Sequence, residues 1–588
     1  MSKYQLNTSI QQVQATGGMW SAVKKMLPLL STERKQLSYA GVAIVVNSTL
    51  NLVGPIIVGH TIDDYIQTGN YHGVIVNTIG LIAIYATALV SSYAQTRLMG
   101  GVGQRVLFKL RHQLFEQLQA LPVAFFQQNK AGDLISRINN DTDKLGQFFS
   151  QSLMQFVGNV FMIIGSGIAL VWVNPRLGLA ALIPAAVLFV ITKLLGPWIK
   201  RQNAANMTST GGLSAEIQES LDNFKVVVAF NRRDFFRTSF ATANEINYKT
   251  ALKAGIANNT FTPIYGLASN SAILIVLLYA FHLITIGAFT FGLLISFLTY
   301  ISRFYDPLRQ MANLWTTFQV ALAGWDRIHA ILLMRSDLVV LPATTPSTTT
   351  GLLEFNHVSF QYTDQAVVLK DVTFALQAGK SYALVGPTGG GKTTAASLMA
   401  RLFDPTEGVI YLHGRDLRSY TPAERAEQIG FILQEPYLFT GTVAENIRYG
   451  HPTLGEADNS ALNQALIERG LDVIIAKFPD GLDTQVAANG DTMSLGQKQL
   501  IAFVRAILRN PKLLILDEAT ANIDTITEQL LESILRKLPS DTTRVVIAHR
   551  LNTIADADTI FFVNSQTITE AGSMEHAVEM LLKDQRTS

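Results

Sequence analysis

Cysteine is absent from this sequence of 588 residues. Its absence excludes disulfide bonds, thiol catalysis and zinc sites built from cysteine. Charged residues are also scarce, because they make up 15% of the chain against about 25% in an average soluble protein. Hydrophobic residues make up 48%, and the mean hydropathy is +0.24. This balance argues against a disordered chain and against an ordinary soluble enzyme.

The few charges are distributed unevenly along the chain. Residues 1–330 hold 25 Lys and Arg against 14 Asp and Glu, a net charge of +11, whereas residues 331–588 hold 21 against 30, a net charge of −9. The basic half is also the apolar half, so its charge does not indicate a nucleic-acid partner. The first residues are polar, and no secretory signal peptide is expected.

Six apolar stretches approach the length of about 20 residues that crosses a membrane. They lie near residues 38–59, 73–96, 152–173, 177–196, 264–286 and 290–306. Lys and Arg are concentrated in the segments on one side of these stretches, and the positive-inside rule therefore places both chain termini in the cytoplasm. Buried helices of a soluble protein are the alternative, which the near absence of charge inside the stretches disfavours.

Acidic residues are almost absent from the expected spans. Asp306 is the only one near a span, at its end beside Arg303. Ion and proton pathways usually contain intramembrane charges, so an ion-coupled transporter is disfavoured. The polar residues singled out inside the spans are uncharged, and hydrogen bonding between helices is favoured over substrate contact for each; they are Asn47, Asn51, Gln95, Gln155, Asn159, Asn270 and Tyr300.

The segments between the spans predict further helices. The cytoplasmic connections near 97–151 and 197–263 are too long for structureless loops in a compact protein. We expect them, and the segment that follows the sixth span, to be helices that continue beyond the bilayer. Residues 17–35 mix Trp and Leu with Lys and Arg, which suits a helix at the cytoplasmic membrane interface.

The chain changes character after the last of these helices. Residues 337–350 are rich in Pro, Ser and Thr and lack helical periodicity, which predicts a linker. From Leu352 onward, short β-like runs alternate with helical segments, which predicts an α/β domain. We therefore expect four parts: an N-terminal segment with the interfacial helix, a six-helix transmembrane domain, a linker and an α/β domain, at residues 1–36, 37–332, 333–350 and 351–588.

A phosphate-binding motif lies in the α/β part. Residues 386–393, GPTGGGKT, fit the pattern GxxxxGK[ST], and they follow a predicted strand at Ser381–Val385 and open an apolar helix. Backbone N–H groups of such a loop cradle phosphates, the lysine binds the β- and γ-phosphates, and the hydroxyl residue binds Mg²⁺. The expected ATP-binding residues here are Gly386, Pro387, Thr388, Gly389, Gly390, Gly391, Lys392, Thr393 and Thr394.

A second motif, LLILDE at residues 513–518, is an apolar strand that ends in two carboxylates. Asp517 is expected to hold Mg²⁺ together with Thr393, and Glu518 is expected to orient or deprotonate the attacking water. A strand followed by two surface acids is common by itself. The upstream phosphate-binding loop is what favours a catalytic interpretation.

With these motifs, nearly the whole chain resembles a half-transporter of the ATP-binding-cassette (ABC) exporter family with six membrane spans. The resemblance implies a membrane all-α domain fused to an α/β P-loop ATPase domain, with ATP and Mg²⁺ as cofactors. It implies that Tyr362 stacks on adenine and that Asp524 belongs to the nucleotide site. It assigns the γ-phosphate and Mg²⁺ to Gln434 and a catalytic switch role to His549. In the first cytoplasmic connection, the family run is matched around Phe125, Phe126, Gly132, Asp133, Arg137 and Asp141.

The sequence departs from the family at the signature, which is usually LSGGQ. Here the run is MSLGQ, so that Ser494, Gly496 and Gln497 match but Leu495 replaces a glycine. The usual preceding glutamate is also missing. In the family, each ATP lies between the P-loop of one chain and the signature of another. The combination resembles one half of a heterodimeric exporter, whose partner supplies an intact signature; a homodimer that tolerates Leu495 is the alternative.

These features predict ATP-driven export of hydrophobic or amphipathic compounds, and multidrug efflux in particular, across a bacterial cytoplasmic membrane. The expected partners are a second half-transporter with an intact signature, the lipid bilayer and hydrophobic small molecules, without nucleic acid. A lipid or lipid-linked flippase is the main alternative. A peptide exporter, an ABC importer and a soluble ABC ATPase are less favoured.

Overall fold

The computed structural model describes residues 4–6, 28–342, 351–362, 366–490, 492–517, 525–547, 557–572, 575–577, 579 and 580. The chain forms two compact units. One is a helical unit made of residues 28–119 and 132–333. The other is an α/β unit made of residues 4–6 and 120–131 together with the described residues from 334 onward.

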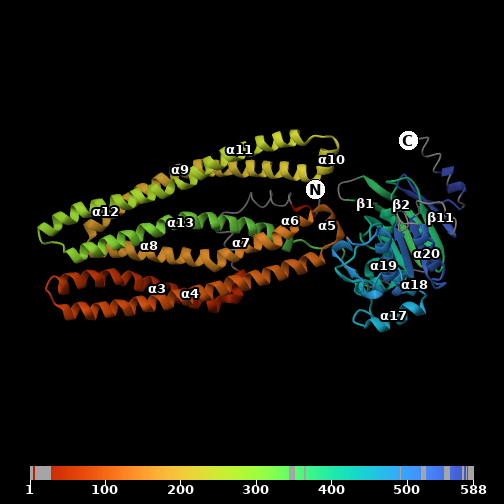
Figure 1. Cartoon of the computed structure of the whole chain (residues 1–588), viewed down its shortest axis with the longest axis horizontal. Helices are drawn as coiled ribbons and strands as arrows, with labels where there is room; N and C mark the ends of the chain where they lie inside the picture. Colours follow the sequence, from red (N-terminus) through yellow and green to blue (C-terminus); the bar gives the residue numbers. More distant parts are fainter. Residues whose placement is uncertain are drawn as a thin grey trace. The chain divides into compact units, whose positions relative to one another are not determined.

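Long helices dominate the helical unit (Figure 1). Short π-helical segments at Ile62–Ile66, Arg137–Asp141 and Phe148–Ser152 and a 3₁₀ turn at Ser31–Glu33 adjoin them. The helices are α3 (Arg34–Thr61), α4 (Tyr71–Ala120), α6 (Ala131–Ser136), α7 (Thr142–Gln147), α8 (Leu153–Val173), α9 (Pro175–Asp222), α10 (Phe224–Ala229), α11 (Arg233–Asn259), α12 (Phe261–Thr285) and α13 (Phe291–Leu332).

Local sequence signals mark the tight turns between these helices. Asn174 precedes the proline that begins α9, and its side chain accepts a hydrogen bond from the N–H of Leu177 at 3.1 Å. Thr290 caps α13 in the same way through the N–H of Leu293. An uncharged N-cap side chain of this kind satisfies a backbone donor that the helix itself leaves unpaired.

Among the described residues, five helices are long and apolar enough to cross a membrane. They contain the first five predicted spans. As expected, α4, α9 and the helical stretch formed by α11 and α12 continue well beyond their apolar parts. The sixth predicted span, 290–306, lies on α13, which is long but not among the five. Its apolar run is short because Arg303 and Asp306 interrupt it.

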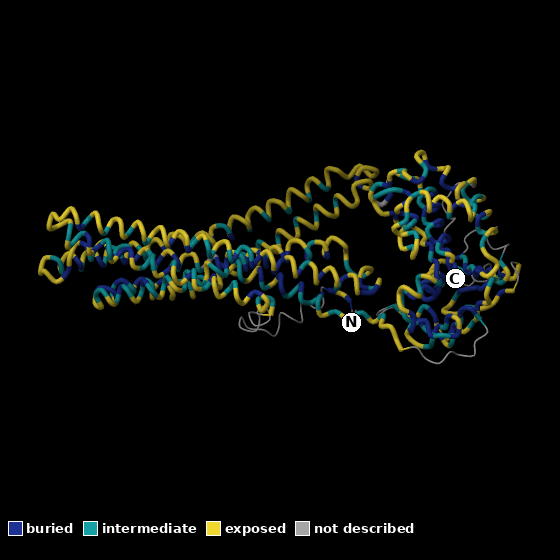
Figure 2. The backbone as a smooth tube through the Cα atoms, turned by 90° about the horizontal axis from the view of Figure 1, so that it is seen from below, coloured by how far each residue is buried: buried dark blue, intermediate teal, exposed yellow. Residues whose placement is uncertain are grey.

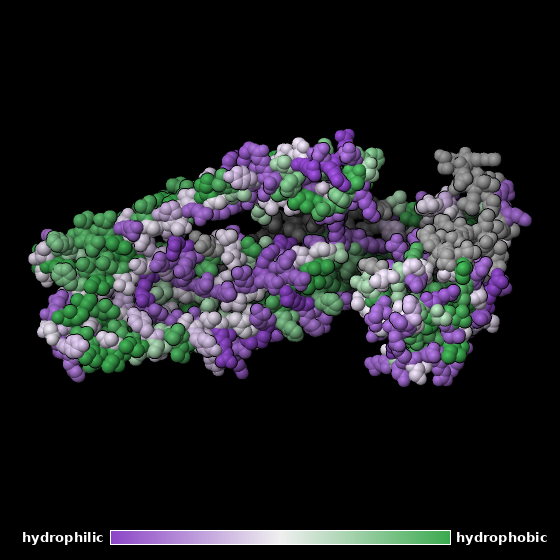
Figure 3. Space-filling model, viewed as in Figure 1, coloured by the Kyte–Doolittle hydropathy of each residue, from purple (hydrophilic) through white to green (hydrophobic). Residues whose placement is uncertain are grey.

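The helical unit is apolar on its outside as well as inside. Its core surrounds Phe297 and Tyr300, whose hydroxyl donates to the carbonyl of Leu52. Leu89, Leu194 and Leu278 are each more than 70% exposed, and exposed residues follow much of each long helix in Figure 2. Figure 3 shows hydrophobic side chains gathered at the end of the unit where α12 turns into α13. A surface of this kind is expected to be covered by lipid or by another protein chain.

A buried ion-pair cluster stabilises the helical extensions that the sequence predicts beyond the spans. Asp141 is 3% exposed and accepts from Arg327 at 2.6 Å and from Lys144 at 3.0 Å. Arg137, which is 1% exposed, donates to Asp133 at 3.2 Å and to the carbonyl of Arg327 at 3.2 Å. Buried charges of this kind are tolerated only when they are paired and hydrogen-bonded. Three residues of the predicted family run therefore form one packing unit with α13.

The α/β unit contains two main sheets (Figure 1). An antiparallel sheet has the order β2-β1-β4-β5, from Val367–Leu376, Leu353–Gln361, Glu407–Leu412 and Arg415–Asp416. A six-stranded sheet has the order β12-β11-β3-β10-β9-β6, from Thr567–Glu570, Thr559–Asn564, Ser381–Val385, Thr543–Ile547, Leu513–Asp517 and Ile429–Ile432. All its pairs are parallel except β11 with β12. β7 (Gly441–Thr442) and β8 (Gln485–Val486) form a small ribbon.

Two of the hydrophobic cores in the described part of this unit lie on opposite sides of β9. Alternate residues of β9 point to opposite faces, because side chains along a strand alternate: Leu513 and Ile515 lie in a core with α14 (Lys392–Met399) and the antiparallel sheet, whereas Leu514 and Leu516 lie in a core with α19 (Leu495–Leu508). The remaining helices are α5 (Val123–Gln128), α15 (Pro422–Gln428), α16 (Val443–Arg448), α17 (Asn459–Glu468), α18 (Asp472–Ile475) and α20 (Thr525–Arg536), with 3₁₀ turns at Leu417–Ser419, Gly481–Asp483 and Ala488–Gly490. The expected fold class, a helical membrane domain followed by a P-loop α/β domain, is confirmed.

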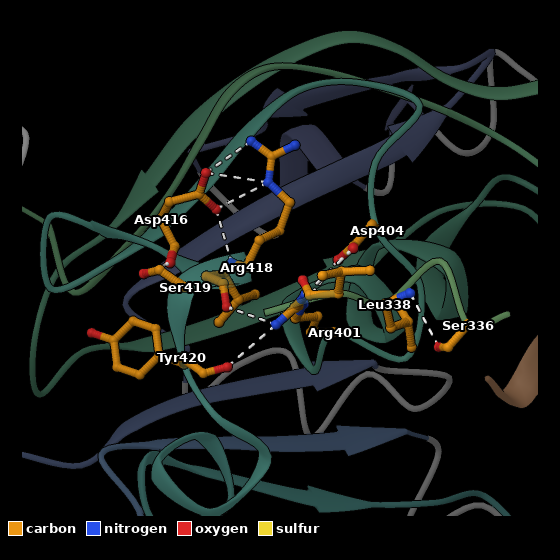
Figure 4. A network of polar contacts seen from close by, with 10 residues as sticks. Ser336, Leu338, Arg401, Asp404, Asp416, Arg418, Ser419 and Tyr420 are labelled. Carbon is orange, nitrogen blue, oxygen red and sulfur yellow. Dashed lines mark hydrogen bonds and ion pairs between the residues drawn. The ribbon is translucent and has the colours of Figure 1, made fainter. Parts of the chain in front are cut away.

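Part of the predicted linker is bound to the α/β unit. Arg401, which is 2% exposed, donates to the carbonyl of Val339 at 2.8 Å and to the carboxylate of Asp404 at 2.9 Å. It also donates to the carbonyls of Leu417 and Tyr420, and Figure 4 shows this guanidinium within the network. One arginine thus joins the linker to the loops around the antiparallel sheet.

The N-terminal segment 4–6 is also anchored in the α/β unit. Asn129 donates to the carbonyls of Tyr4 and Phe125 at 2.8 Å each, and it accepts from the N–H of Leu6 at 3.2 Å. Tyr4 and Leu6 are buried, and the Tyr4 hydroxyl accepts from the N–H of Asp337 at 3.1 Å. The expected interfacial helix at 17–35 lies mostly outside the described residues, and only its end from residue 28 is helical in the structure.

Candidate nucleotide-binding site

The glycine-rich loop 386–391 joins β3 to α14, as the sequence predicts. β3 is buried at all five positions, and α14 begins at Lys392. The ammonium group of Lys392 donates to the carbonyls of Gly386 at 2.8 Å and Pro387 at 2.9 Å. It is 6% exposed, so its charge is held at the opening of the loop, where an anionic phosphate would be bound.

Glycine is required in this loop for two reasons. Gly386 and Gly391 have φ values of 147° and 107°, a region that favours glycine. Gly390 has no such backbone requirement, but a Cβ there would meet the carbonyl oxygen of Val563 at 2.6 Å. The loop therefore packs its backbone directly against β11. This close packing fits a cradle in which backbone N–H groups, rather than side chains, face the phosphates.

The strand order brings the second motif to the same edge. β3, β9, β10 and β6 are parallel, so their carboxyl ends lie together at one edge of the sheet. Asp517 ends β9, is 4% exposed, and accepts a hydrogen bond from the Thr393 hydroxyl at 3.3 Å. A hydroxyl and a carboxylate at this spacing are oxygen ligands of the kind that Mg²⁺ prefers, with the remaining positions left for water and phosphate.

Two other predicted residues lie beside this pair. Gln434 follows β6, the strand next to β9, and its side chain is exposed. The hydroxyl of Tyr362 lies 3.0 Å from the hydroxyl of Thr394 on α14. The structure therefore brings Tyr362, Gln434, the P-loop and Asp517 to one side of the α/β unit. Glu518, Asp524 and His549 lie outside the described residues, although Glu518 follows directly on β9 and His549 follows β10 by two positions.

Aromatic packing around Tyr362 was not foreseen from the sequence. Its ring contacts Phe360 at a centroid distance of 4.9 Å and Phe403 at 5.4 Å, both edge to face. Phe360 is a strand residue, and Phe403 belongs to the loop after α14. Only the fold brings these rings together, so no local spacing in the sequence signals them. They fix the orientation of the tyrosine ring that is expected to stack on adenine.

The signature residues lie at the start of another helix. Ser494 is the N-cap of α19: its hydroxyl accepts from the N–H of Gln497 at 3.2 Å, and the Gln497 side chain accepts from the N–H of Ser494 at 3.0 Å. This reciprocal pair is a capping box. Leu495 occupies the first helical position and is half-buried, and Gly496 is buried. Because α19 packs in the second core, the signature and the P-loop lie over different cores of the unit.

Comparison with protein-family models identifies both parts of the chain. The model for the ABC transporter transmembrane region matches residues 37–308. The model for the ABC transporter matches residues 369–521, which include the P-loop and the strand that ends in Asp517.

Curated relatives match over nearly the full length. The ABC transporter ATP-binding protein YfiC of Bacillus subtilis is 32% identical over 95% of this chain and 92% of that protein. A fatty acid ABC transporter ATP-binding/permease protein of Mycobacterium tuberculosis is 32% identical over 84% of this chain and 77% of its own length. An ATP-dependent lipid A-core flippase of Syntrophus aciditrophicus is 30% identical over 94% of this chain and 91% of its own length.

Proposed function

This chain belongs to the ABC transporter family, as an exporter with fused transmembrane and ATPase domains, and from that premise we propose that it drives multidrug export as one half of a heterodimer. Its ABC domain is an ATPase coupled to transport. The cargo in this proposal is hydrophobic or amphipathic, and the membrane is the bacterial cytoplasmic membrane, with both termini and the ATPase domain inside. The observation that carries the proposal is the Thr393–Asp517 pair at the P-loop of a chain with membrane-spanning helices.

The proposed domain boundaries are those of the sequence: 1–36, 37–332, 333–350 and 351–588. The transmembrane family model begins at residue 37 and supports the first boundary. The change from helix α13 to strand β1 between residues 332 and 353 supports the linker. In this division Arg401 binds the first part of the linker to the ATPase domain.

Each group of the proposed site has a chemical task. Bound MgATP supplies the free energy for closure of two ATPase domains, since it binds the closed state better than the open one. Lys392 would neutralise phosphate charge, while Thr393 and Asp517 would hold Mg²⁺. Glu518, directly after Asp517, orients or deprotonates the attacking water. Gln434 and His549 follow the two strands beside β9 and are proposed to contact the γ-phosphate. Tyr362 stacks on adenine.

The heterodimer proposal depends on Leu495. The capping box of Ser494 and Gln497 keeps the N-terminus of α19 formed despite the substitution. A helix N-terminus with free N–H groups attracts phosphate. A leucine at the first helical position places a bulky side chain where a glycine would let the backbone approach a phosphate. In the proposal, ATP at this signature is hydrolysed slowly, and ATP at Glu518, which faces the partner's intact signature, is hydrolysed quickly.

A lipid substrate is the second candidate. Two of the relatives are named for lipid-type substrates, a fatty acid and lipid A-core. The same ATPase site would serve such a flippase. Stimulation of ATP hydrolysis by lipids rather than by drugs separates the two candidates.

The first experiment is the subunit composition of the tagged protein, purified in mild detergent from its native membrane and analysed by intact mass. A second half-transporter at equal stoichiometry, with an LSGGQ signature and no catalytic glutamate, is the expected result. ATP-dependent uptake of a fluorescent drug into inverted vesicles then tests export itself. A homodimer with brisk ATPase activity would contradict the heterodimer, and absence of ATP-driven movement of any amphiphile would contradict export.

A further inference from the structure

Five of the uncharged polar residues singled out in the spans line one cavity of the helical unit. The cavity has a volume of about 560 Å³, which lies in the range of small-molecule sites. Its walls come from α3, α4, α8 and α13. The five lie on the first three of these helices and are Asn47, Asn51, Gln95, Gln155 and Asn159, and the polar side chains that α13 adds include Arg303. Helix–helix hydrogen bonding, which the sequence favours for these residues, accounts for only some of their polar atoms.

The hydrogen bonds among these residues leave two buried atoms without a partner. Asn51 donates to the Asn47 side-chain oxygen at 3.1 Å, and the Arg303 Nη1 group donates to the Asn51 side-chain oxygen at 3.2 Å. In the described part of the chain, Arg303 Nε and Gln95 Oε1 are buried and have no hydrogen-bond partner. A buried polar group without a hydrogen-bond partner destabilises the folded protein, and a charged group does so more strongly. A ligand that accepts from Arg303 Nε and from the Gln95 amide, once that amide turns its NH₂ group toward the ligand, removes this cost.

The charge balance at the cavity determines the sign of that ligand. Among the lining residues the charged side chains are Arg303 and Asp306. Asp306 pairs with Arg309, which is outside the lining, at 3.7 Å. No carboxylate of the described residues pairs with Arg303. The guanidinium is half-buried, so its field acts in a medium of lower dielectric constant than water and favours an anion.

We propose that this cavity binds the anionic head group, a carboxylate or a phosphate, of a single-chain amphiphile. Arg303 is its counter-ion, and a guanidinium pairs with either head group through two donors. Gln95 supplies a further hydrogen bond, because its amide can turn to present either the oxygen or the NH₂ group. Met154 and Met162 on α8 offer apolar surface to the first part of the chain. The inference rests on the proposed export function and specifies the class of cargo.

The test measures binding to the full-length protein in nanodiscs, without ATP, by equilibrium dialysis. The four probes share a hexadecyl chain and differ in the head group: palmitate, hexadecyl phosphate, hexadecanol and hexadecyltrimethylammonium. We expect the two anions to bind at least about tenfold more tightly than the alcohol and the cation, since a charged hydrogen bond is worth about 1.5–3 kcal/mol. Of the two anions, the tighter one identifies the head group.

Three variants assign the effect to one side chain. Arg303→Gln should lose about tenfold in affinity for the anions and leave hexadecanol binding unchanged. Arg303→Lys keeps the charge and should retain most of the anion affinity, which also shows that the site still folds. Arg97→Gln is the matched control, because this exposed arginine of α4 lies outside the cavity lining. It should bind all four probes as the unmodified protein does.

The outcomes distinguish this inference from the proposed function. Equal affinity for all head groups, preference for the cation, or anion binding that Arg303→Gln does not weaken would overturn the head-group site. Export of a neutral fluorescent drug by the same preparation would leave the proposed function intact in each of these cases. If anions bind through Arg303 but no ATP-driven movement of any amphiphile occurs, the export function fails while the head-group site stands.

Discussion

At the residue scale, the P-loop shows how side-chain size limits a site made of backbone. Gly390 needs no special backbone angle, yet the carbonyl of Val563 leaves no room for a side chain. Thr388, two positions earlier, is exposed. The motif GxxxxGK[ST] predicts a glycine at its first position. The requirement for glycine at position 390 instead comes from packing against a strand that follows more than 170 residues later.

Gly390→Ala should therefore weaken nucleotide binding. Overpacking costs about 1–3 kcal/mol, so displacement of the loop should lower the affinity for a fluorescent ATP analogue by about tenfold. Thr388→Ala is the control and should change the affinity by less than about twofold, because the loop binds phosphate through its backbone. Equal affinities for the two variants would contradict the packing argument.

Leu495→Gly tests the proposed division of labour at the level of one side chain. Removal of the leucine lets backbone approach the second nucleotide, so slow hydrolysis at that site should accelerate. The main site, with Glu518, should keep its rate. Single-turnover hydrolysis by the purified complex separates a fast from a slow phase, and only the slow phase should change. Loss of all activity in this variant would refute the assignment of sites.

At the element scale, irregular segments depend on a few buried polar groups. The linker is held by Arg401, and Leu341 adds a bond from its N–H to the carbonyl of Arg418 at 2.9 Å. His451 has a similar role at the end of α19. Its Nε2 group lies 3.2 Å from the carbonyl of Leu508, while Nδ1 accepts from the N–H of Leu454 at 3.1 Å. These contacts stabilise the linker and the segment around His451, which are irregular.

Arg401→Met should destabilise the ATPase domain by about 3 kcal/mol, because it leaves a carboxylate and several carbonyls without a donor. The apparent melting temperature of the full-length protein in detergent should fall by about 6–12 °C. Lys370→Met replaces an exposed cation and should leave it unchanged. A fall of the same size in both variants would indicate a general charge effect instead of the buried network.

His451 predicts a pH dependence of stability. Burial lowers the pKa of His451, and the charges of Arg469 and Arg509 lower it further, against the opposing hydrogen bond to Leu508. The unfolded chain therefore binds this proton first as the pH falls. The stabilising contribution is present above about pH 6.5 and decreases below it. His451→Gln should flatten the fall of melting temperature between about pH 7 and pH 5.

The control for the histidine is His72→Gln, which replaces an exposed histidine of α4 and should keep the slope of the unmodified protein. Identical slopes for the His451 variant and the unmodified protein would show that another group is responsible for the acid sensitivity.

At the scale of the whole molecule, the two charge balances correspond to two environments. Among the described residues, the basic, apolar half contains the five helices that are apolar enough to cross a membrane, and the acidic half contains the two main sheets of the ATPase domain. The first half has an apolar exposed surface, and the second half has a polar nucleotide site. The proposed export requires that ATP hydrolysis in the second half be coupled to movement of cargo through the first.

Glu518→Gln tests that coupling. The variant keeps the size of the side chain but cannot act as a base, so it should lose most hydrolysis while nucleotide affinity stays near that of the unmodified protein. Uptake of drug into inverted vesicles should stop together with hydrolysis. Persistent uptake at the normal rate would show that transport does not depend on this residue, and near-normal turnover would remove its catalytic role.

The sequence by itself determined the fold class, because each signal for it is local. Apolar stretches of membrane-spanning length, the P-loop between a strand and a helix, and the strand that ends in Asp517 all depend on neighbours in the chain. The sixth predicted span is not among the five helices of the described residues that are apolar enough to cross a membrane, since Arg303 and Asp306 shorten its apolar run. Tertiary structure alone decided which distant residues meet where no motif marks them: Arg401 with Val339, and Asn51 with Arg303. Such contacts form because a buried polar group is stable only when it is hydrogen-bonded, and packing determines which groups lie within reach of it. The spacing of residues along the chain does not indicate these partners.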